Sequence, residues 1–156
     1  MSCSYDDYMI RKDALLLASH VLLHMLRRPD QPATSETMAG WGGTHSVVIR
    51  RTFAGLRRAG IVASEKGHGG GWRLARDPRT ITVADIQRAL ASETPAQSLQ
   101  RPECLVEQAI EDALSDARAE ADLVLERRLE TWTLADLNAA VARLHAASPF
   151  ITGDLS

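Results

Sequence analysis

The chain has 156 residues, of which 45% are hydrophobic and 24% charged, and this composition excludes a disordered or fibrous protein. Its length allows one substantial core and an appended element. The net charge of −2 hides an asymmetry, because residues 1–92 hold 13 Lys/Arg against 8 Asp/Glu, whereas residues 93–156 hold 5 against 12. No stretch approaches the roughly 18 apolar residues of a membrane span, and no signal-peptide core is present, so we expect a cytoplasmic protein.

Two helices are predicted in the first part of the chain. Residues 13–28 carry apolar side chains at intervals of three and four, which predicts a helix with one buried face. Pro29 ends it, and Thr34 or Ser35 can cap a shorter helix that runs through Trp41. Two glycines follow and allow a sharp turn, so the next helix completes a helix-turn-helix.

The third predicted helix runs from a capping Thr44 to Ala59 and has two different faces. Ile49, Phe53 and Leu56 recur at intervals of four and three, and we expect them to point into the core. The opposite face suits a helix that lies in a DNA groove, since small residues allow close approach and arginines reach phosphates and guanine edges. This outer face comprises Val47, Arg51, Ala54 and Arg58, and Arg50 and Arg57 flank it.

Residues 61–66 and 72–76 predict two short strands joined by the glycine-rich loop 67–71. Four glycines in five positions favour a tight hairpin tip with exposed backbone amides. We do not expect a nucleotide phosphate loop, because the lysine and the hydroxyl of that motif are missing. The expected inward residues of the hairpin are Ile61, Ala63, Trp72 and Leu74.

A capping box formed by Thr82 and Asp85 predicts a fourth helix over residues 83–91. Residues 92–103 contain two prolines and little periodicity, and we interpret them as a linker. Residues 147–156 are interpreted as a frayed tail.

A long helix is predicted over residues 104–130, and Thr133 with Asp136 begins a last helix that ends near His145. The long helix has an apolar seam although the preceding domain is already complete. We therefore expect it to pack against a second copy of the chain, because two-fold dimers dominate homo-oligomers; packing onto its own domain is the alternative. The expected dimerisation seam comprises Val106, Ile110, Ala113, Ala117, Ala121 and Val124.

Several stretches of the chain together resemble the Rrf2-type transcriptional regulators, and they are residues 47–51, 56–62, 67–75, 81–86 and 133–137. The resemblance implies a mainly α-helical fold with a small β-hairpin wing. A winged helix-turn-helix domain would occupy residues 1–91, and a long dimerisation helix with a C-terminal helix would occupy residues 104–146. It also implies a homodimer that binds double-stranded DNA at a palindromic promoter site and thereby represses or activates transcription, and of the two we expect repression.

Family members that sense through an iron–sulfur cluster carry three cysteines before the dimerisation helix, whereas this chain has only Cys104 there. Glu107 stands where a histidine follows in the cluster regulator. Because a cluster needs about four ligands, mostly thiolates, we expect no cofactor. Cys104 is a candidate redox-sensing thiol beside a helix N-terminus, or an inert remnant of a lost cluster site. His20 and His24 have a metal-binding spacing without a third ligand, so we expect no metal.

We expect the third helix to enter the major groove and the wing to reach an adjacent groove or the DNA backbone. His45 and Ser46 replace the Asn-Pro that relatives commonly have at the start of this helix. No catalytic motif is evident, so we expect no enzyme; the alternative function is protein–protein contact controlled by a partner protein or a small ligand. The residues expected at DNA are Thr44, His45, Ser46, Val47, Arg50, Arg51, Arg58, Lys66, His68 and Arg73.

Overall fold

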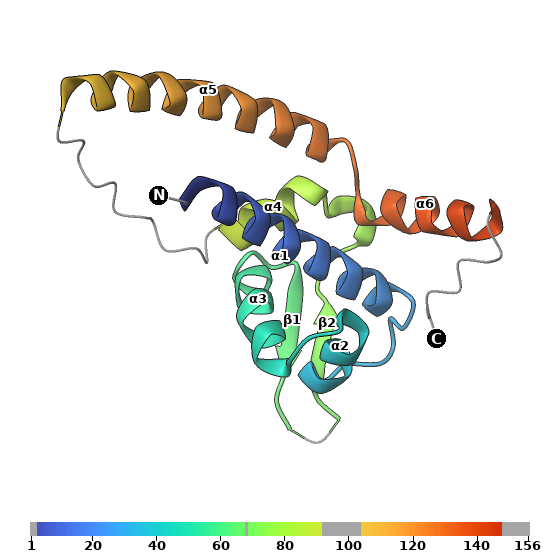
Figure 1. The fold of residues 1–156 in the computed structure, drawn as a ribbon. Helices are drawn as coiled ribbons and strands as arrows, with labels where there is room; N and C mark the ends of the chain where they lie inside the picture. Colours follow the sequence, from blue (N-terminus) through green and yellow to red (C-terminus); the bar gives the residue numbers. More distant parts are fainter. Residues whose placement is uncertain (1–2, 68, 92–103, 148–156) are drawn as a thin grey trace.

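The computed structural model describes residues 3–67, 69–91 and 104–147, with side chains from residue 13 onward. Helices α1 to α4 and a β-hairpin form one body, and α5 lies across it and extends beyond it (Figure 1). The predicted mainly α-helical fold with a small hairpin wing is confirmed. The elements are α1 (Cys3–Leu26), α2 (Ser35–Gly42), α3 (Ser46–Arg58), β1 (Val62–Glu65), β2 (Gly71–Leu74), the 3₁₀ helix η1 (Pro78–Thr80), α4 (Val83–Ala91), α5 (Leu105–Glu130) and α6 (Leu134–Ala147).

One core joins helices α1 to α4, and Leu134 at the start of α6 belongs to it as well. Leu22 of α1, Met38 of α2, Phe53 of α3 and Ile86 of α4 are all fully buried. Burying a side chain of this size contributes about 1.5–3 kcal/mol, so these contacts hold the helix-turn-helix against α1 and α4. Phe53 also meets the ring of Trp72 edge-on, with ring centroids 5.7 Å apart. The predicted inward face of α3 is therefore confirmed.

Helix α1 differs from the prediction at both ends. It begins at Cys3, ten residues before the expected start, because the prediction followed the regular apolar spacing back only to Asp13. It ends at Leu26, two residues early. Arg27 and Arg28 donate their backbone N–H groups to carbonyls three residues back, which closes a turn ahead of Pro29. Proline disfavours the helical conformation in the residue before it.

The turn between α2 and α3 corrects one predicted cap. The backbone N–H of Thr37 donates to the Thr34 hydroxyl over 3.1 Å, so Thr34 caps α2 as predicted. Gly43 then adopts a left-handed conformation with φ of 60°. Thr44 was expected to cap α3, but its N–H donates to the carbonyl of Ala39 and closes the turn after α2. The cap position of α3 is His45, whose side chain makes no capping bond.

The hairpin is shorter than predicted, and its faces differ in one position. Strands β1 and β2 pair antiparallel from Val62 opposite Leu74 to Glu65 opposite Gly71. Val62 is fully buried, whereas Ala63, which was expected to point inward, lies opposite the exposed Arg73. Side chains alternate between the two faces of a strand, and the strand begins one residue later than expected, so Ala63 belongs to the outer face.

The C-terminal helices are joined to the core at the starts of α4 and α6. The N–H of Val83 donates to the carbonyl of Trp132 over 2.9 Å, and the N–H of Leu134 donates to the carbonyl of Ile81 over 2.8 Å. Both predicted capping boxes are present at these starts. Helix α6 runs two residues past the expected end, so Ala147 belongs to it, and the remaining tail and the linker 92–103 lie outside the described residues.

Helix α5 lies against the domain through charged contacts. The guanidinium of Arg88 on α4 forms ion pairs with Glu126 at 3.0 Å and Glu130 at 3.3 Å. None of the residues of α5 is buried. Among the described helices, none combines the length and apolarity needed to cross a membrane.

Candidate nucleic-acid interface

The outward face of α3 is exposed from its first turn to its last. Val47, Arg50 and Arg51 lie in the first two turns and are exposed, and Arg58 is exposed at the end of the helix. Ala54 between them is partly exposed and adds little bulk. This face is therefore cationic and permits close approach of a flat or grooved surface.

The N-terminal end of α3 adds to this positive character. His45 is exposed, and Thr44 and Ser46 are partly exposed, at the point where the helix begins. Helix α3, which the structure describes in full, has no acidic residue in its first turn and no side-chain cap. Unpaired backbone N–H groups and the helix dipole favour anions such as phosphate at such an end.

Sequence reasoning did not identify a partner of Arg50. The guanidinium of Arg50 donates to Ser46 Oγ over 2.9 Å and lies 4.0 Å from a carboxylate oxygen of Glu36. Glu36 lies in the first turn of α2, so this contact links the two helices of the motif. The Arg50–Ser46 contact follows from their helical spacing of four residues, whereas the Glu36 contact depends on the turn between the helices.

The wing places its glycines where larger residues would not fit. Gly67 and Gly69 have φ values of 102° and 79°, which only glycine adopts readily. A Cβ atom at Gly70 would collide with the carbonyl of Glu65, and one at Gly71 would lie 2.8 Å from the carbonyl oxygen of Ala33. Backbone conformation therefore favours glycine at positions 67 and 69, and close approach of the backbone favours it at positions 70 and 71.

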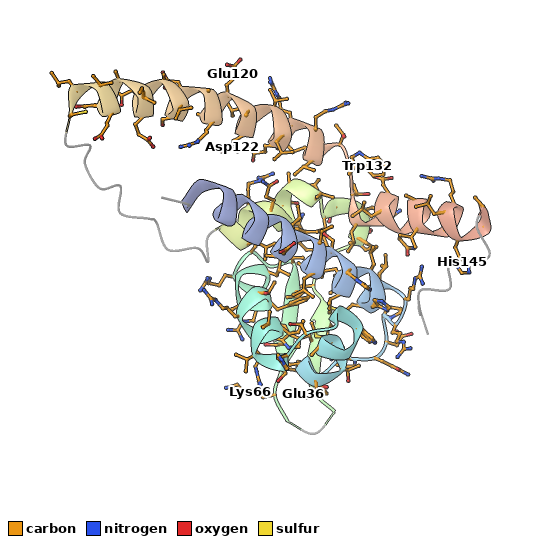
Figure 2. All side chains as sticks on the ribbon, viewed as in Figure 1. Glu36, Lys66, Glu120, Asp122, Trp132 and His145 are labelled. Atoms are coloured by element: carbon orange, nitrogen blue, oxygen red, sulfur yellow. The ribbon has the colours of Figure 1, made fainter. Side chains whose placement is uncertain are left out.

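Two of the predicted wing residues are exposed beside this loop. Lys66 follows β1 directly, and Arg73 on β2 forms an ion pair with Glu65 at 2.7 Å. His68 lies outside the described residues. Figure 2 shows Lys66 and Glu36 at the same end of the molecule, whereas Glu120 and Asp122 of α5 lie at the opposite end. The end of the molecule that carries Lys66 and Glu36 thus lies opposite the acidic residues Glu120 and Asp122 of α5.

His20 and His24, considered at first for metal binding, form a stacked cluster with Trp41. Their Nε2 atoms are 2.9 Å apart, and the ring of His24 stacks on Trp41 with centroids 5.3 Å apart. Burial, together with the nearby His20, Arg27 and Arg28, lowers the pKa of His24 below its ordinary value. No group of three metal-ligating side chains occurs within the described part of the chain. The cluster packs α1 against α2.

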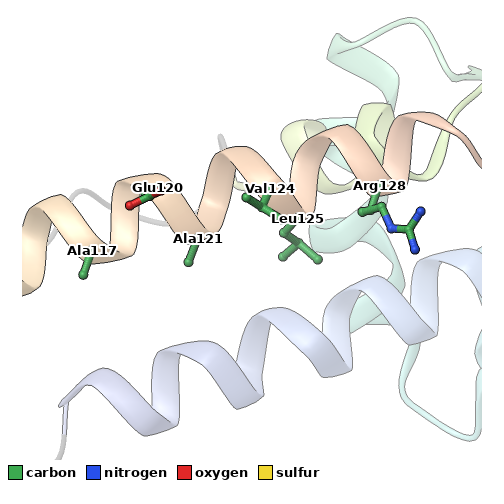
Figure 3. Close-up of a pocket in the computed structure, with 6 residues that line it drawn as sticks. All are labelled: Ala117, Glu120, Ala121, Val124, Leu125 and Arg128. Carbon is green, nitrogen blue, oxygen red and sulfur yellow. The ribbon is translucent and has the colours of Figure 1, made fainter.

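The expected dimerisation seam lies on the exposed surface of α5. Val106, Ile110 and Val124 are among the exposed large hydrophobic residues, and the three seam alanines are exposed as well. Figure 3 shows Ala117, Ala121 and Leu125 pointing toward the side on which α1 lies. Together with Val124 they line a shallow apolar pocket flanked by Glu120 and Arg128.

Cys104 occupies the cap position of α5. Its side chain is exposed, and its Sγ accepts a hydrogen bond from the backbone N–H of Glu107 over 3.3 Å. The thiol therefore acts as a weak helix cap at the boundary between the linker and α5. The side chain of Cys3 lies outside the described residues.

A helix-turn-helix with a basic outer face, followed by a β-hairpin wing, defines a winged-helix DNA-binding protein. The sequence pattern of the Rrf2 family, described as iron-dependent transcriptional regulators, matches residues 12–140. The chain belongs to this Rrf2 family of transcriptional regulators.

Individual relatives agree with this assignment. YwnA of Bacillus subtilis, classed as an HTH-type transcriptional regulator, is 29% identical over 126 residues, which cover 79% of this chain and 92% of YwnA. Protein rrf2 of Nitratidesulfovibrio vulgaris is 30% identical over 109 residues, which cover 69% of this chain and 72% of that protein. The solved structure of T. potens IscR matches with a TM-score of 0.57 at 26% identity, over 83% of this chain and 85% of that one.

Proposed function

We propose that the chain is a homodimeric repressor that binds a palindromic promoter site, with α3 in the major groove and the wing on an adjacent groove or the backbone. The observation that carries the proposal is the exposed outer face of α3, where Arg50 and Arg51 stand beside Val47 in the first two turns. Arginines reach phosphates and guanine edges, and the first turns of a recognition helix lie nearest the bases.

The two halves of the chain would divide this work. Residues 1–91 form the DNA-binding domain, and residues 104–146 provide the dimerisation helix and the C-terminal helix. The apolar seam of α5 supports this division, because an exposed row of Val, Ile and Ala side chains gains stability when a second copy covers it. Two-fold symmetry of the protein would then match two-fold symmetry of the DNA site.

The first test is to select bound duplexes from a random pool with the full chain and to measure affinity for the selected site by fluorescence anisotropy. We expect Arg50→Ala/Arg51→Ala to abolish specific binding, since each good arginine–guanine contact contributes about 1–3 kcal/mol of discrimination. Arg118→Ala/Arg127→Ala on α5 removes the same charge away from the interface and should bind normally. Retained affinity of the first variant at moderate salt would contradict the assignment.

A second measurement tests the alternative function, in which the fold serves only for contact with another protein. Binding to DNA through phosphates should weaken steeply with salt, by about 0.9 logarithmic units of affinity per tenfold salt for each phosphate neutralised. A selected site placed over a promoter should lower transcription when the protein is added. Salt-insensitive binding would favour a protein partner, and increased transcription would contradict repression.

A further inference from the structure

One apolar side chain stands out on the outer face of α3. The side chain of Val47 is 69% exposed, and its neighbour Val48 is 40% exposed. Between residues 17 and 91, leaving out residue 68, these two are the exposed large hydrophobic residues; the others lie on α1 and from α5 onward. Val47 is therefore not part of the core, to which Ile49, Phe53 and Leu56 of the same helix belong.

The surroundings of Val47 are cationic. Arg50 and Arg51 lie three and four residues further along α3 and so stand beside Val47 on the same helix face. Arg50 is held by its hydrogen bond to Ser46 and by the nearby carboxylate of Glu36. A methyl-bearing side chain among guanidinium groups is complementary to a surface that combines negative charge with an apolar group. The major groove of DNA has this combination, because thymine carries a C5-methyl group there.

We propose that Val47 recognises a thymine by contact with its C5-methyl group and that Arg50 binds a guanine within one or two base pairs of that thymine. The proposal rests on the DNA-binding function proposed above. Side chains three residues apart on a helix are separated by about 5–6 Å between Cβ atoms, and successive base pairs by about 3.4 Å. The two side chains therefore span neighbouring positions of one half-site.

The chemistry distinguishes thymine from the other bases. Guanine and adenine present N7 acceptors at this place in the groove, and cytosine presents an amino donor, none of which pairs with a valine. Arginine in contrast donates two hydrogen bonds to O6 and N7 of guanine. A guanidinium that is already oriented by Ser46 loses less freedom when it binds.

The test removes the methyl group and nothing else. In the selected duplex, each thymine is replaced in turn by deoxyuridine, and affinity is measured by fluorescence anisotropy at constant salt. We expect one position in each half-site to bind about three- to fivefold more weakly, the effect of losing one buried methyl group. Val47→Ser should bind the thymine and the deoxyuridine duplexes equally.

A matched control and a second substitution complete the experiment. Leu144→Ser changes a side chain of α6 that is 68% exposed, and this variant should keep the preference for thymine. Replacing guanines by 7-deazaguanine removes the N7 acceptor, and the sensitive guanine should lie within two base pairs of the sensitive thymine. Arg50→Ala should abolish that sensitivity.

The outcomes separate the two proposals. Binding to a selected duplex without any effect of deoxyuridine, or with the same effect in Val47→Ser, overturns the valine–thymine contact and leaves the DNA-binding function standing. A sensitive guanine more than two base pairs away overturns the assigned spacing. If the full chain binds no duplex at all and instead captures a protein through α3, both proposals are wrong.

Discussion

The indole N–H of Trp72 in β2 donates a hydrogen bond of 3.0 Å to Ser35 Oγ at the first residue of α2. The backbone of Trp72 also exchanges two hydrogen bonds with Ala33, of 2.8 and 2.9 Å. One residue therefore connects the wing to the segment that leads into the helix-turn-helix. Its ring completes the connection by packing edge-on against Phe53 of α3.

Replacing this indole tests its contribution to stability. Trp72→Phe keeps an aromatic ring near Phe53 but removes the N–H donor, so the free energy of unfolding should fall by about 1–3 kcal/mol. Urea unfolding followed by circular dichroism measures the change. Ser35→Ala should cost less, and the double variant should lose less than the sum of both, because the two changes remove one shared hydrogen bond. Full additivity would show that the bond contributes nothing.

Charging the seam of α5 tests dimerisation. Ala121→Glu would bury an unpaired carboxylate between two copies, so the dimer should dissociate at least about tenfold more readily in sedimentation equilibrium. Leu123→Glu is the matched control, because residue 123 is exposed and lies about 200° from residue 121 around the helix. An unchanged dimer in the first variant, or a native chain that is monomeric throughout, would contradict the proposed assembly.

The buried imidazole of His24 predicts a loss of stability in mild acid. Because burial lowers its pKa below the ordinary value of about 6.5, the unfolded chain binds a proton that the folded chain resists. The contribution of neutral His24 to the free energy of unfolding is complete above the ordinary histidine pKa. It decreases as the pH falls below that pKa and is lost once the pH drops through the lowered pKa of the folded chain.

Thermal unfolding measured between pH 7.5 and pH 5 tests this effect. The lower limit of the interval is about one unit above the ordinary pKa of the carboxyl groups. The midpoint temperature should fall over that interval for the native chain and should fall less for His24→Phe, which keeps a ring against Trp41. His145→Phe, at an exposed position of α6, should behave like the native chain. The lowered pKa values of Asp77 and Asp136 act only at more acidic pH, because their stabilisation is lost below the ordinary carboxyl pKa.

Cys104→Ser separates the capping role of this residue from its thiol chemistry. Serine is a good helix cap, so the stability of α5 should be unchanged or slightly higher. A thiol that senses oxidants should make DNA binding of the native chain sensitive to peroxide, and the serine variant should lose that sensitivity. Equal responses of the two proteins would exclude signalling through Cys104, and Cys3→Ser is the control for the other cysteine.

The repeating patterns of the sequence predicted most of the helices because each of them depends on neighbours close in the chain. The buried stripe of α3 and the capping boxes at Thr82 and Thr133 are examples. The one cap that was wrong depends on where the turn after α2 closes: the N–H of Thr44 donates to the carbonyl of Ala39, and α3 begins one residue later than expected, with His45 in the cap position. In the sequence, a hydroxyl residue after two glycines is equally compatible with closing the turn after α2 and with capping α3.

Contacts between elements were the part that sequence patterns could not supply. Glu36 meets Arg50 only because the Gly43 turn sets the angle between α2 and α3. The alternation in β1 was misassigned by one residue, since Ile61 and Val62 are both buried and periodicity alone does not mark where a strand begins.

The backbone hydrogen bonds between Ala33 and Trp72 have a consequence for how regulators of this shape could change the DNA site that they prefer. Trp72 ties the wing to the segment before α2 and, through Phe53, to α3, so in the proposed complex we expect the separation of the two DNA contacts to be the same for every site that a protomer occupies. Exchanging outer residues of α3 would alter the preferred bases without altering that separation. In the proposed dimer, a new distance between half-sites would require changes in α5, because that helix would set how the two protomers are spaced.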